Sequence, residues 1–276
     1  TKPPQGFRNR NSFEVQKLLL NIAYDKANYV GTHDPKGLGG TAGSVEKALH
    51  KRHLIYLPIP IECKRRLSKR KRRSRLNELC LKLNLPNINA DFIGIVPSRV
   101  DFEWKGHDLI LNAIKNLNDK QKIHLVFSGW GNDYSQAKQM VDQYEINDFI
   151  TFLPFSLSKP LLTEFFSLMD FSIDQFRFLG TYGTALVEAL SSGCPAITWI
   201  EEEAYISMGW SPPPVMNAKS IQDLIKILNS IVNKEIDLEN FSKKSINWIK
   251  ETHSPNKVLP NLIKKFKNIR SKSIKL

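Results

Sequence analysis

The sequence has few of the residues that mark a disulfide-bonded, zinc-binding or membrane-spanning protein. Its 276 residues include three cysteines, Cys63, Cys80 and Cys194, which are odd in number and not in a paired spacing. This argues against disulfides and against a zinc site, so we expect reduced thiols. No apolar run reaches the roughly 18 residues that span a bilayer, and residues 1–6 lack the apolar core of a signal peptide. We therefore expect a cytoplasmic protein.

Acidic residues are missing from two basic segments, although the formal net charge of the whole chain is +13. Nine basic residues lie between Lys64 and Arg75, and six lie between Lys264 and Lys275. Without these 15, the chain has 25 basic and 27 acidic residues, so the excess charge is local. No aromatic side chains interleave the first segment for base stacking, and we expect no nucleic-acid partner.

Two interpretations of the basic segments stay open. They are solubilising surface charge, or they bind an anionic membrane surface, where each basic residue contributes about 1 kcal/mol. The second interpretation would make the protein peripheral at the inner face of the plasma membrane. Because leucines follow the first segment at helical spacing, we expect residues 64–75 to be the exposed first half of a helix whose second half packs.

Short apolar runs alternate with helical patterns from residue 91 onward. This alternation predicts an α/β fold, a Rossmann-like doubly wound parallel sheet of five strands. The expected strands are 91–97, 123–127, 149–153, 171–173 and one that ends at 200. Intervening helices are expected at 108–117, up to 144, at 159–168 and after 183, followed by helices at 221–232, 238–251 and 255–267.

The first 59 residues suggest a partial α/β segment that precedes this sheet. We expect helices at 11–27 and 44–50, strands at 28–31 and 54–57, and a domain boundary at Pro58-Ile-Pro60. The glycines from Gly37 to Gly43 form either a phosphate loop or a flexible turn, and the short strand before them favours the turn. Since the first residue is not Met, we expect a fragment with three parts: 1–59, 60–253, and a C-terminal helix with basic tail at 254–276.

The stretch 170–200 is expected to form a strand, a glycine-containing turn, a helix and a second strand. Gly180 and Gly183 precede the helix, where backbone N–H groups and the helix dipole favour a phosphate. Glu188 lies one to two turns into the helix, where its carboxylate can accept hydrogen bonds from sugar hydroxyls. The alternative is a surface glutamate on an ordinary crossover helix.

The ends of the other expected strands carry compatible groups. Arg99 and Lys105 follow the first strand, Gly129 and Gly131 the second, and Phe155 the third. Singly, these are solvated charges, tight-turn glycines and a peripheral aromatic residue. Together, at the carboxyl edge of one sheet, they fit a diphosphate with an attached base.

The order of these motifs resembles a known family. Its elements are Arg99 with Lys105-Gly106, Gly129-Trp-Gly131, Ile150-Thr-Phe-Leu153, Asp170-Phe-Ser-Ile, and Glu188-Ala-Leu-Ser-Ser-Gly193-Cys-Pro195. This set resembles the C-terminal, donor-binding half of GT-B glycosyltransferases, specifically glycosyltransferase family 4, over residues 91–200.

The resemblance implies retaining, metal-independent transfer of a sugar from a nucleotide-diphosphate-sugar donor to a hydroxyl of a glycan or lipid-linked acceptor. By position, Arg99 and Lys105 would neutralise the diphosphate, and Glu188 would hold the ribose. The amides of Gly183 and Thr184 would cap a phosphate, and Phe155 would edge the base. It also implies that the C-terminal helix crosses back toward the N-terminal part.

One departure from the family keeps other functions open. The family usually has a glutamate eight positions before the second one, at the place of Gly180, and that glutamate normally touches the donor sugar. Asp174, Arg177 or the backbone of Thr181 and Tyr182 would have to orient the sugar instead. The alternatives are a non-catalytic nucleotide-sugar-binding subunit and a sugar-nucleotide epimerase of the same fold.

Overall fold

The computed structural model describes residues 29–32, 53–154, 156–177 and 180–273. The chain divides into two compact units, which we describe separately. One comprises Thr1–Pro58 and Glu203–Trp210, and the other comprises Ile59–Glu202 and Ser211–Leu276. The helices expected at 11–27 and 44–50, and the glycines from Gly37 to Gly43, lie outside the described residues.

In the first unit, strands β1 (Tyr29–Thr32) and β2 (His53–Tyr56) pair in parallel. The N–H of Leu57 continues the ladder by donating to the carbonyl of Thr32 at 2.9 Å. The ring of Tyr56 stacks on Trp210 with centroids 4.5 Å apart. Trp210 follows helix α9 (Glu202–Ser207), which the sequence did not predict. Both strands lie within one residue of their predicted positions.

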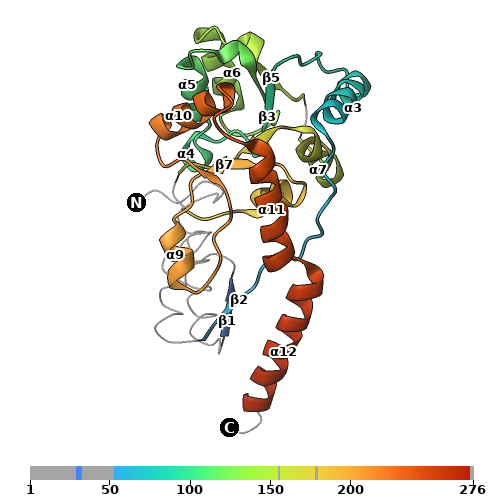
Figure 1. The fold of residues 1–276 in the computed structure, drawn as a ribbon. Coiled ribbons are helices and arrows are strands. Elements are labelled where there is room, and N and C mark those ends of the chain that lie inside the picture. Colours follow the sequence, from blue (N-terminus) through green and yellow to red (C-terminus); the bar gives the residue numbers. More distant parts are fainter. Residues whose placement is uncertain (1–28, 33–52, 155, 178–179, 274–276) are drawn as a thin grey trace. The chain divides into compact units, whose positions relative to one another are not determined.

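The second unit contains a parallel sheet of six strands in the order β5-β4-β3-β6-β7-β8 (Figure 1). The strands are β3 (Phe92–Val96), β4 (Ile123–Phe127), β5 (Ile150–Phe152), β6 (Phe171–Ile173), β7 (Ala196–Thr198) and β8 (Met216–Asn217). The chain moves outward from β3 to β5 and then returns to the other side of β3, which is the doubly wound order. The predicted fold is confirmed, but the predicted number of strands is wrong, because β8 has only two residues and no apolar run marks it.

Helices cover both faces of this sheet. The helices of this unit are α3 (Lys69–Lys82), α4 (Phe102–Lys105), α5 (His107–Lys115), α6 (Tyr134–Gln143), α7 (Lys159–Leu168), α8 (Thr184–Ser191), α10 (Ile221–Val232), α11 (Leu238–Thr252) and α12 (Pro255–Ser273), of which α12 runs from the end of α11 away from the sheet (Figure 1). Short 3₁₀ turns precede β4 and β5, at Lys120–Lys122 and Asn147–Phe149. In Figure 1, α5, α6 and α10 lie on one side of the sheet, and α3 and α7 lie on the other.

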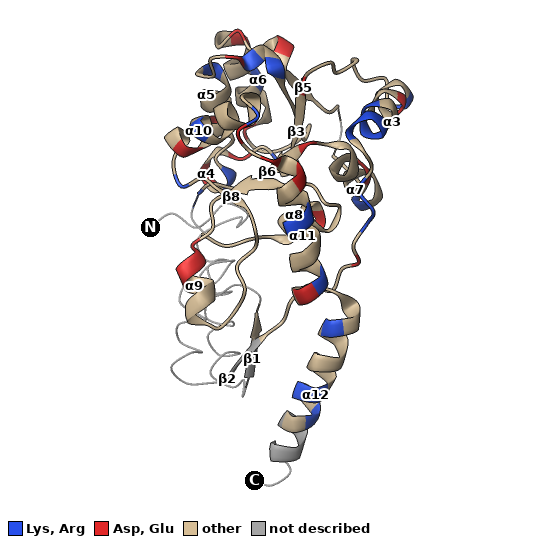
Figure 2. Ribbon diagram, viewed as in Figure 1, with Lys and Arg blue, Asp and Glu red and all other residues tan. Residues whose placement is uncertain are grey.

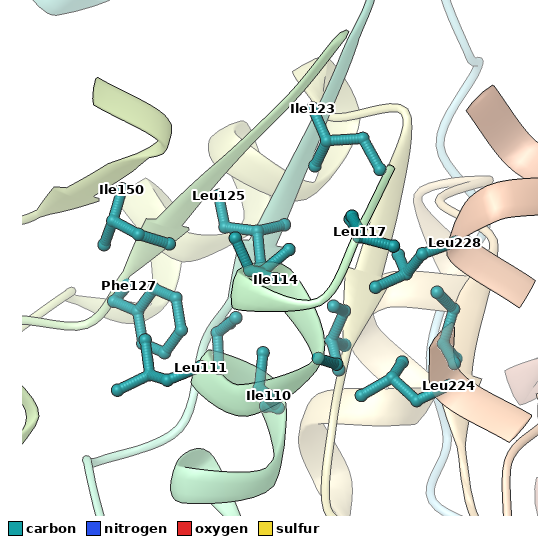
Figure 3. Close-up of a cluster of buried hydrophobic side chains, with 14 of the residues drawn as sticks. Ile110, Leu111, Ile114, Leu117, Ile123, Leu125, Phe127, Ile150, Leu224 and Leu228 are labelled. Atoms are coloured by element: carbon teal, nitrogen blue, oxygen red, sulfur yellow. The ribbon is translucent and has the colours of Figure 1, made fainter. Parts of the chain in front are cut away.

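Strand β3 shows how the sheet separates two cores. Its side chains alternate, so Phe92 and Val96 join the cluster under α5, α6 and α10, while Ile93 and Ile95 join the cluster under α3 and α7. Figure 3 shows the first cluster, where isoleucines and leucines of α5 meet β4, β5 and α10. Full burial of each such side chain contributes about 1.5–3 kcal/mol to the free energy of folding. The two cores hold β3 and β6 firmly at the centre of the sheet.

Most of the basic segment 64–75 is exposed, as predicted, but α3 begins only at Lys69 and three arginines of the segment make internal contacts. Arg72 is 2% exposed and forms an ion pair with Asp170 at 3.0 Å, and Arg73 pairs with the same carboxylate. Arg66 donates to the carbonyl of Met169 at 2.9 Å. The reason is that Asp170 is buried at the start of β6, where a carboxylate needs cationic partners. Other basic residues of α3 stay exposed, and Figure 2 shows the basic residues of this helix in blue.

The last helix, α12, carries an exposed apolar stripe. Leu259, Ile263 and Phe266, at spacings of four and three residues, are 49%, 54% and 53% exposed. Lysines 264, 265 and 267 lie beside them in the sequence, and Figure 2 shows blue segments along this helix. Among the helices that the structure describes, none is long and apolar enough to cross a membrane.

Candidate functional site

The candidate site lies where the order of the strands reverses. Strands β3 and β6 are neighbours, although β4 and β5 separate them in the sequence. In doubly wound sheets the loops that follow two such strands run to opposite faces, and ligands bind between them at the carboxyl edge. We describe the loops that follow β3, β4, β6 and β7 in turn.

The loop after β3 is built on Asp101, whose side chain is inaccessible to solvent. One oxygen, Oδ1, caps α4 by accepting from the N–H of Trp104 at 2.8 Å. The other, Oδ2, lies 3.3 Å from both Nε and Nη2 of Arg99. The Arg99 side chain keeps 42% of its surface exposed. This cation is therefore oriented by a buried carboxylate and still accessible to an anion.

The buried ring of His107 contacts both Ser98 and Asp101 of the same loop. Its side chain is fully buried, with Nδ1 3.1 Å from the backbone nitrogen of Asp101 and Nε2 3.4 Å from Oγ of Ser98. Burial lowers the pKa of His107 to about 4, and the positive charge of Lys105 acts in the same direction. The ring is therefore neutral near pH 7 and fixes the loop without adding charge.

The loop after β4 packs directly on the loop after β3. Gly131 has φ +138°, and a Cβ there would lie 2.2 Å from the carbonyl oxygen of Val100, so a side chain does not fit. The N–H of Val100 donates to the carbonyl of Trp130 at 2.8 Å, and the N–H of Phe102 donates to Oδ2 of Asp133 at 2.7 Å. Gly131 thus allows close contact between two loops. Gly129 lies at the start of the same loop and is partly exposed.

Lys105 joins the loop after β3 to the loop after β6. Its Nζ donates to Oε1 of Gln175 at 2.6 Å. Gln175, only 4% exposed, donates from Nε2 to the carbonyl of Thr181 at 3.0 Å, and its own carbonyl accepts from Oγ1 of Thr198 at 2.8 Å. One glutamine therefore connects Lys105 to the glycine-containing loop and to β7.

The two polar side chains proposed to orient a sugar have different surroundings. Asp174 is 4% exposed, and burial raises the pKa of its carboxyl group, although the positive charge of Lys105 opposes this. Arg177 donates to the carbonyl of Phe102 at 2.9 Å and to Oδ2 of Asp108 at 2.6 Å. A role of either side chain in orienting the sugar stays a prediction.

The described part of the loop between β6 and α8 turns its larger side chains inward. Thr181 and Tyr182 are 2% and 3% exposed, and the ring of Tyr182 meets Trp248 edge-on at 5.7 Å. Gly180 has φ +54°, and its carbonyl accepts from the N–H of Glu201 at 2.8 Å. Glu201 follows β7, and its Oε2 would lie 3.3 Å from a Cβ at Gly180. A carboxylate from another loop therefore lies beside this glycine.

The N-terminus of α8 is open to a ligand. Gly183 is the N-cap residue, and no side-chain hydrogen bond caps the helix there. A Cβ at Gly183 would meet nothing within 4 Å, and Thr184 is exposed. The first N–H groups of a helix have no partner within the helix and carry about half a positive charge. This end of α8 can therefore hold a phosphate.

Glu188 occupies a different part of the site from Arg99 and Lys105. It is 7% exposed, and its Oε1 lies 3.2 Å from Nζ of Lys159, at the start of α7. The ion pair places Glu188 beside the α7 end of the loop after β5. Phe155, predicted in that loop, lies outside the described residues.

The loop contacts connect Lys105, Gly131, Gly180 and Thr181 of the predicted site to neighbouring loops, and they add residues that no motif marked. Gln175, His107 and Glu201 are single residues without a recognisable spacing, and only the sheet order brings them to the same edge. In the part of the chain that the structure describes, no group of three or more His, Cys, Asp or Glu residues could hold a metal ion.

Comparison with known proteins identifies the family. Residues 87–248, more than half of the chain, match the model of the family described as glycosyl transferases group 1. The chain belongs to this family. The matched residues include the loops after β3, β4, β6 and β7, and all of α8. No curated protein sequence matches the chain.

Solved structures of glycosyltransferases share the fold of this group 1 chain. Sucrose-phosphate synthase from Thermosynechococcus elongatus aligns over 99% of this chain and 65% of its own, with 15% identity and a TM-score of 0.67. HepE from Anabaena, solved with UDP and glucose, aligns over 91% of this chain and 66% of its own, with 14% identity and a TM-score of 0.67.

The pneumococcal O-GlcNAc transferase GtfA, solved with UDP and GlcNAc, is a further structural neighbour. It aligns over 95% of this chain and 48% of its own, with 14% identity and a TM-score of 0.63. At such identities the likeness concerns the fold alone. The chain spans from about half to two thirds of the length of these three proteins.

Proposed function

We propose that this chain binds the nucleotide-diphosphate-sugar donor of a retaining glycosyltransferase of the family 4 type. The observation that carries the proposal is the open N-terminus of α8 at the same sheet edge as Arg99 and Lys105. Helix α8 begins at the end of the loop that follows β6, and both cations belong to the segment that follows β3. A diphosphate carries the charge and the acceptor oxygens that such a set binds.

The chemical role of these groups is to stabilise a leaving group. In the transfer, the bond between the sugar C1 and the diphosphate oxygen breaks, and the diphosphate leaves with both electrons. The acceptor oxygen bonds to C1, and its proton passes to the departing phosphate oxygen, which lies on the same face of C1 when the configuration is retained. Lys105, Arg99 and the α8 amides oppose the negative charge that develops on the departing phosphate, which is the role of a metal ion in other enzymes. We therefore propose a metal-independent reaction.

Glu188 and the position of Gly180 concern different parts of the donor, the ribose and the transferred sugar. We propose that Glu188, oriented by Lys159, accepts hydrogen bonds from the ribose of the donor. UDP or a UDP-sugar is the first ligand to test, because HepE and GtfA were solved with UDP. A non-catalytic nucleotide-sugar-binding protein is the second candidate, and the observation that favours it is Gly180, which has no side chain to contact a sugar.

We test this proposal by following donor turnover with NMR. UDP-glucose is incubated with the full-length protein and a glycan acceptor in the presence of EDTA, because this chain spans only part of the length of its structural neighbours and we expect it alone to bind the donor without transferring the sugar. We expect UDP to be released and the α configuration at C1 to be kept in the product. A β-linked product would contradict the retaining mechanism, and loss of turnover with EDTA would contradict the metal-independent one. Binding of UDP-glucose without turnover would favour the non-catalytic candidate.

We also propose that the acceptor side lies at an anionic membrane surface on the cytoplasmic side. The support is the apolar stripe of α12, Leu259, Ile263 and Phe266, with lysines beside it, an arrangement that suits a helix lying in a lipid interface. In the segment 64–75, Arg66, Arg72 and Arg73 make internal contacts, so only its other basic residues can contribute beside α12.

Vesicle co-sedimentation tests this membrane proposal. Changing Lys264, Lys265 and Lys267 to Gln should abolish low-salt binding to vesicles that contain phosphatidylserine. The matched control changes three exposed lysines elsewhere to Gln, Lys219, Lys226 and Lys243. Equal sedimentation with neutral vesicles, or equal loss in both variants, would contradict the proposal.

A further inference from the structure

Glu201 lies at the site without belonging to any motif of the sequence. Its backbone N–H donates to the carbonyl of Gly180 at 2.8 Å, so the loop after β7 is fixed to the loop before α8. Its side chain then lies over Gly180. A Cβ built on this glycine would be 3.1 Å from Cβ and 3.3 Å from Oε2 of Glu201. The carboxylate of Glu201 therefore fills the space that a side chain at position 180 would enter.

The position of this carboxylate suits a neutral, hydroxyl-rich group. Gly180 lies three residues before Gly183, the N-cap of α8, and the N-terminus of α8 is the place for a phosphate. A carboxylate repels phosphate oxygens but accepts hydrogen bonds from hydroxyl groups, and such charge-assisted bonds are strong. The part of a donor that meets Glu201 is therefore the sugar and not the diphosphate.

The neighbouring carboxylates do not compete for this role. Asp174 is 4% exposed, and Asp101 is fully buried against Arg99 and the N-terminus of α4. Asp108 is paired with Arg177 at 2.6 Å. Glu201, like Asp108, is only partly buried. Among these acidic groups, Glu201 is the one that is partly exposed and is bonded through its backbone to Gly180, in the loop that leads into α8.

We infer that Glu201 binds the sugar of the donor by accepting hydrogen bonds from its hydroxyl groups. This inference rests on the proposed function and adds to it the residue that recognises the sugar in a chain with glycine at position 180. A carboxylate there also selects among donors. It favours neutral hexoses and repels a sugar that carries its own carboxylate, such as glucuronic acid.

Calorimetry with paired ligands tests this role. Each nucleotide sugar, UDP-glucose, UDP-glucuronate and GDP-mannose, is titrated beside its free nucleoside diphosphate. Glu201→Gln should leave the affinity for the diphosphate within twofold of the wild type, which also shows that the variant is folded. It should raise the Kd for the neutral nucleotide sugar about tenfold, because hydrogen bonds to a charged acceptor are lost. The discrimination against UDP-glucuronate should fall as well.

Glu202→Gln is the matched control, because Glu202 is the adjacent residue, carries the same charge and is exposed. It should change neither affinity. If the wild type binds none of the diphosphates and none of the sugars, the proposed function fails. If UDP or GDP binds and Glu201→Gln keeps the full affinity for the sugar donor, only the inference about Glu201 is overturned.

Discussion

The two ends of strand β6 carry the same kinds of residues and use them differently. At the amino end, Asp170 is 2% exposed, accepts from the N–H of Ile93 at 2.8 Å and pairs with Arg72 and Arg73. At the carboxyl end, Asp174 is buried without an arginine partner, and Lys105 is bonded to the neutral Gln175. At the amino end, a carboxylate and two arginines pair with one another. At the carboxyl end, the cation of Lys105 is bonded to the neutral side chain of Gln175.

This difference shows why charge alone does not identify a binding site. The cations at the amino end bind the chain itself, since Arg66 donates to the carbonyl of Met169 at 2.9 Å and Arg72 to that of Leu67 at 2.8 Å. They fix the segment before α3, and α3 itself, against the sheet. Lys105 at the carboxyl end is held in place by a neutral partner, and its charge also opposes the rise that burial causes in the pKa of Asp174. We expect this charge to act on an anionic ligand as well.

The largest expected effect comes from breaking the paired end. Asp170→Asn leaves two arginines beside a neutral group in a buried place, and we expect it to lower the free energy of unfolding by about 3–5 kcal/mol. Urea unfolding measures the loss. The control is Glu164→Gln, which removes an exposed pair with Arg75 at 3.6 Å and should cost about 0.5 kcal/mol or less. Similar losses in both variants would contradict a structural role for Asp170.

As the pH falls, the stability that depends on neutral His107, near the carboxyl end of the sheet, should be lost before the stability that depends on ionised Asp170, at the amino end. Burial lowers the pKa of His107 to about 4, below its ordinary value of 6.5, so the folded state holds the ring neutral. The stability from this group is complete above pH 6.5 and is lost as the pH falls toward 4, by about 2 kcal/mol at pH 5. For Asp170, burial alone would raise the pKa, but Arg73 and the hydrogen bonds from Ile93, Arg73 and Arg72 outweigh it and keep the pKa low. Its contribution is therefore lost only below about pH 4.

Thermal unfolding of the wild type and of His107→Asn between pH 7 and pH 5 measures this difference. Asparagine can still accept from the N–H of Asp101 but does not titrate, so the variant should lose about 2 kcal/mol less than the wild type over this range. His124, with a pKa also lowered to about 4 by burial, and Asp174, whose raised pKa acts in the opposite sense, remain in both proteins and cancel in the comparison. Identical pH dependence in both would contradict the assignment to His107.

The sequence predicted the positions of the strands and helices better than it predicted the partners of the charged side chains around the sheet. Apolar runs placed β4 and β6 at their observed residues, as helical patterns did for α7 and α10. These patterns are local, because each element buries its own apolar face. The partner of Arg72 is 98 residues away in the sequence, and no local pattern connects the two. The sequence therefore did not indicate that Arg66, Arg72 and Arg73 of the basic segment make internal contacts.

The site was predicted to the extent that it consists of loops at strand ends. Arg99, Lys105 and Gly183 could be assigned to one sheet edge from the alternation of strands and helices alone. Gln175 and Glu201 could not, because their roles depend on contacts between loops that follow different strands. Gly131 was predicted as a phosphate-loop or turn glycine, and the structure shows the close approach of Val100 that requires it.

The most direct test of the central claim compares the affinity of Lys105→Ala for UDP with its stability. We expect the Kd for UDP, measured by calorimetry, to rise about tenfold or more, since a bond from this cation to phosphate contributes about 1.5–3 kcal/mol. The free energy of unfolding should change by about 1 kcal/mol or less, and Lys243→Ala, at an exposed lysine of α11, should change neither quantity. An unchanged Kd for UDP in Lys105→Ala would show that the carboxyl end of the sheet is not the donor site.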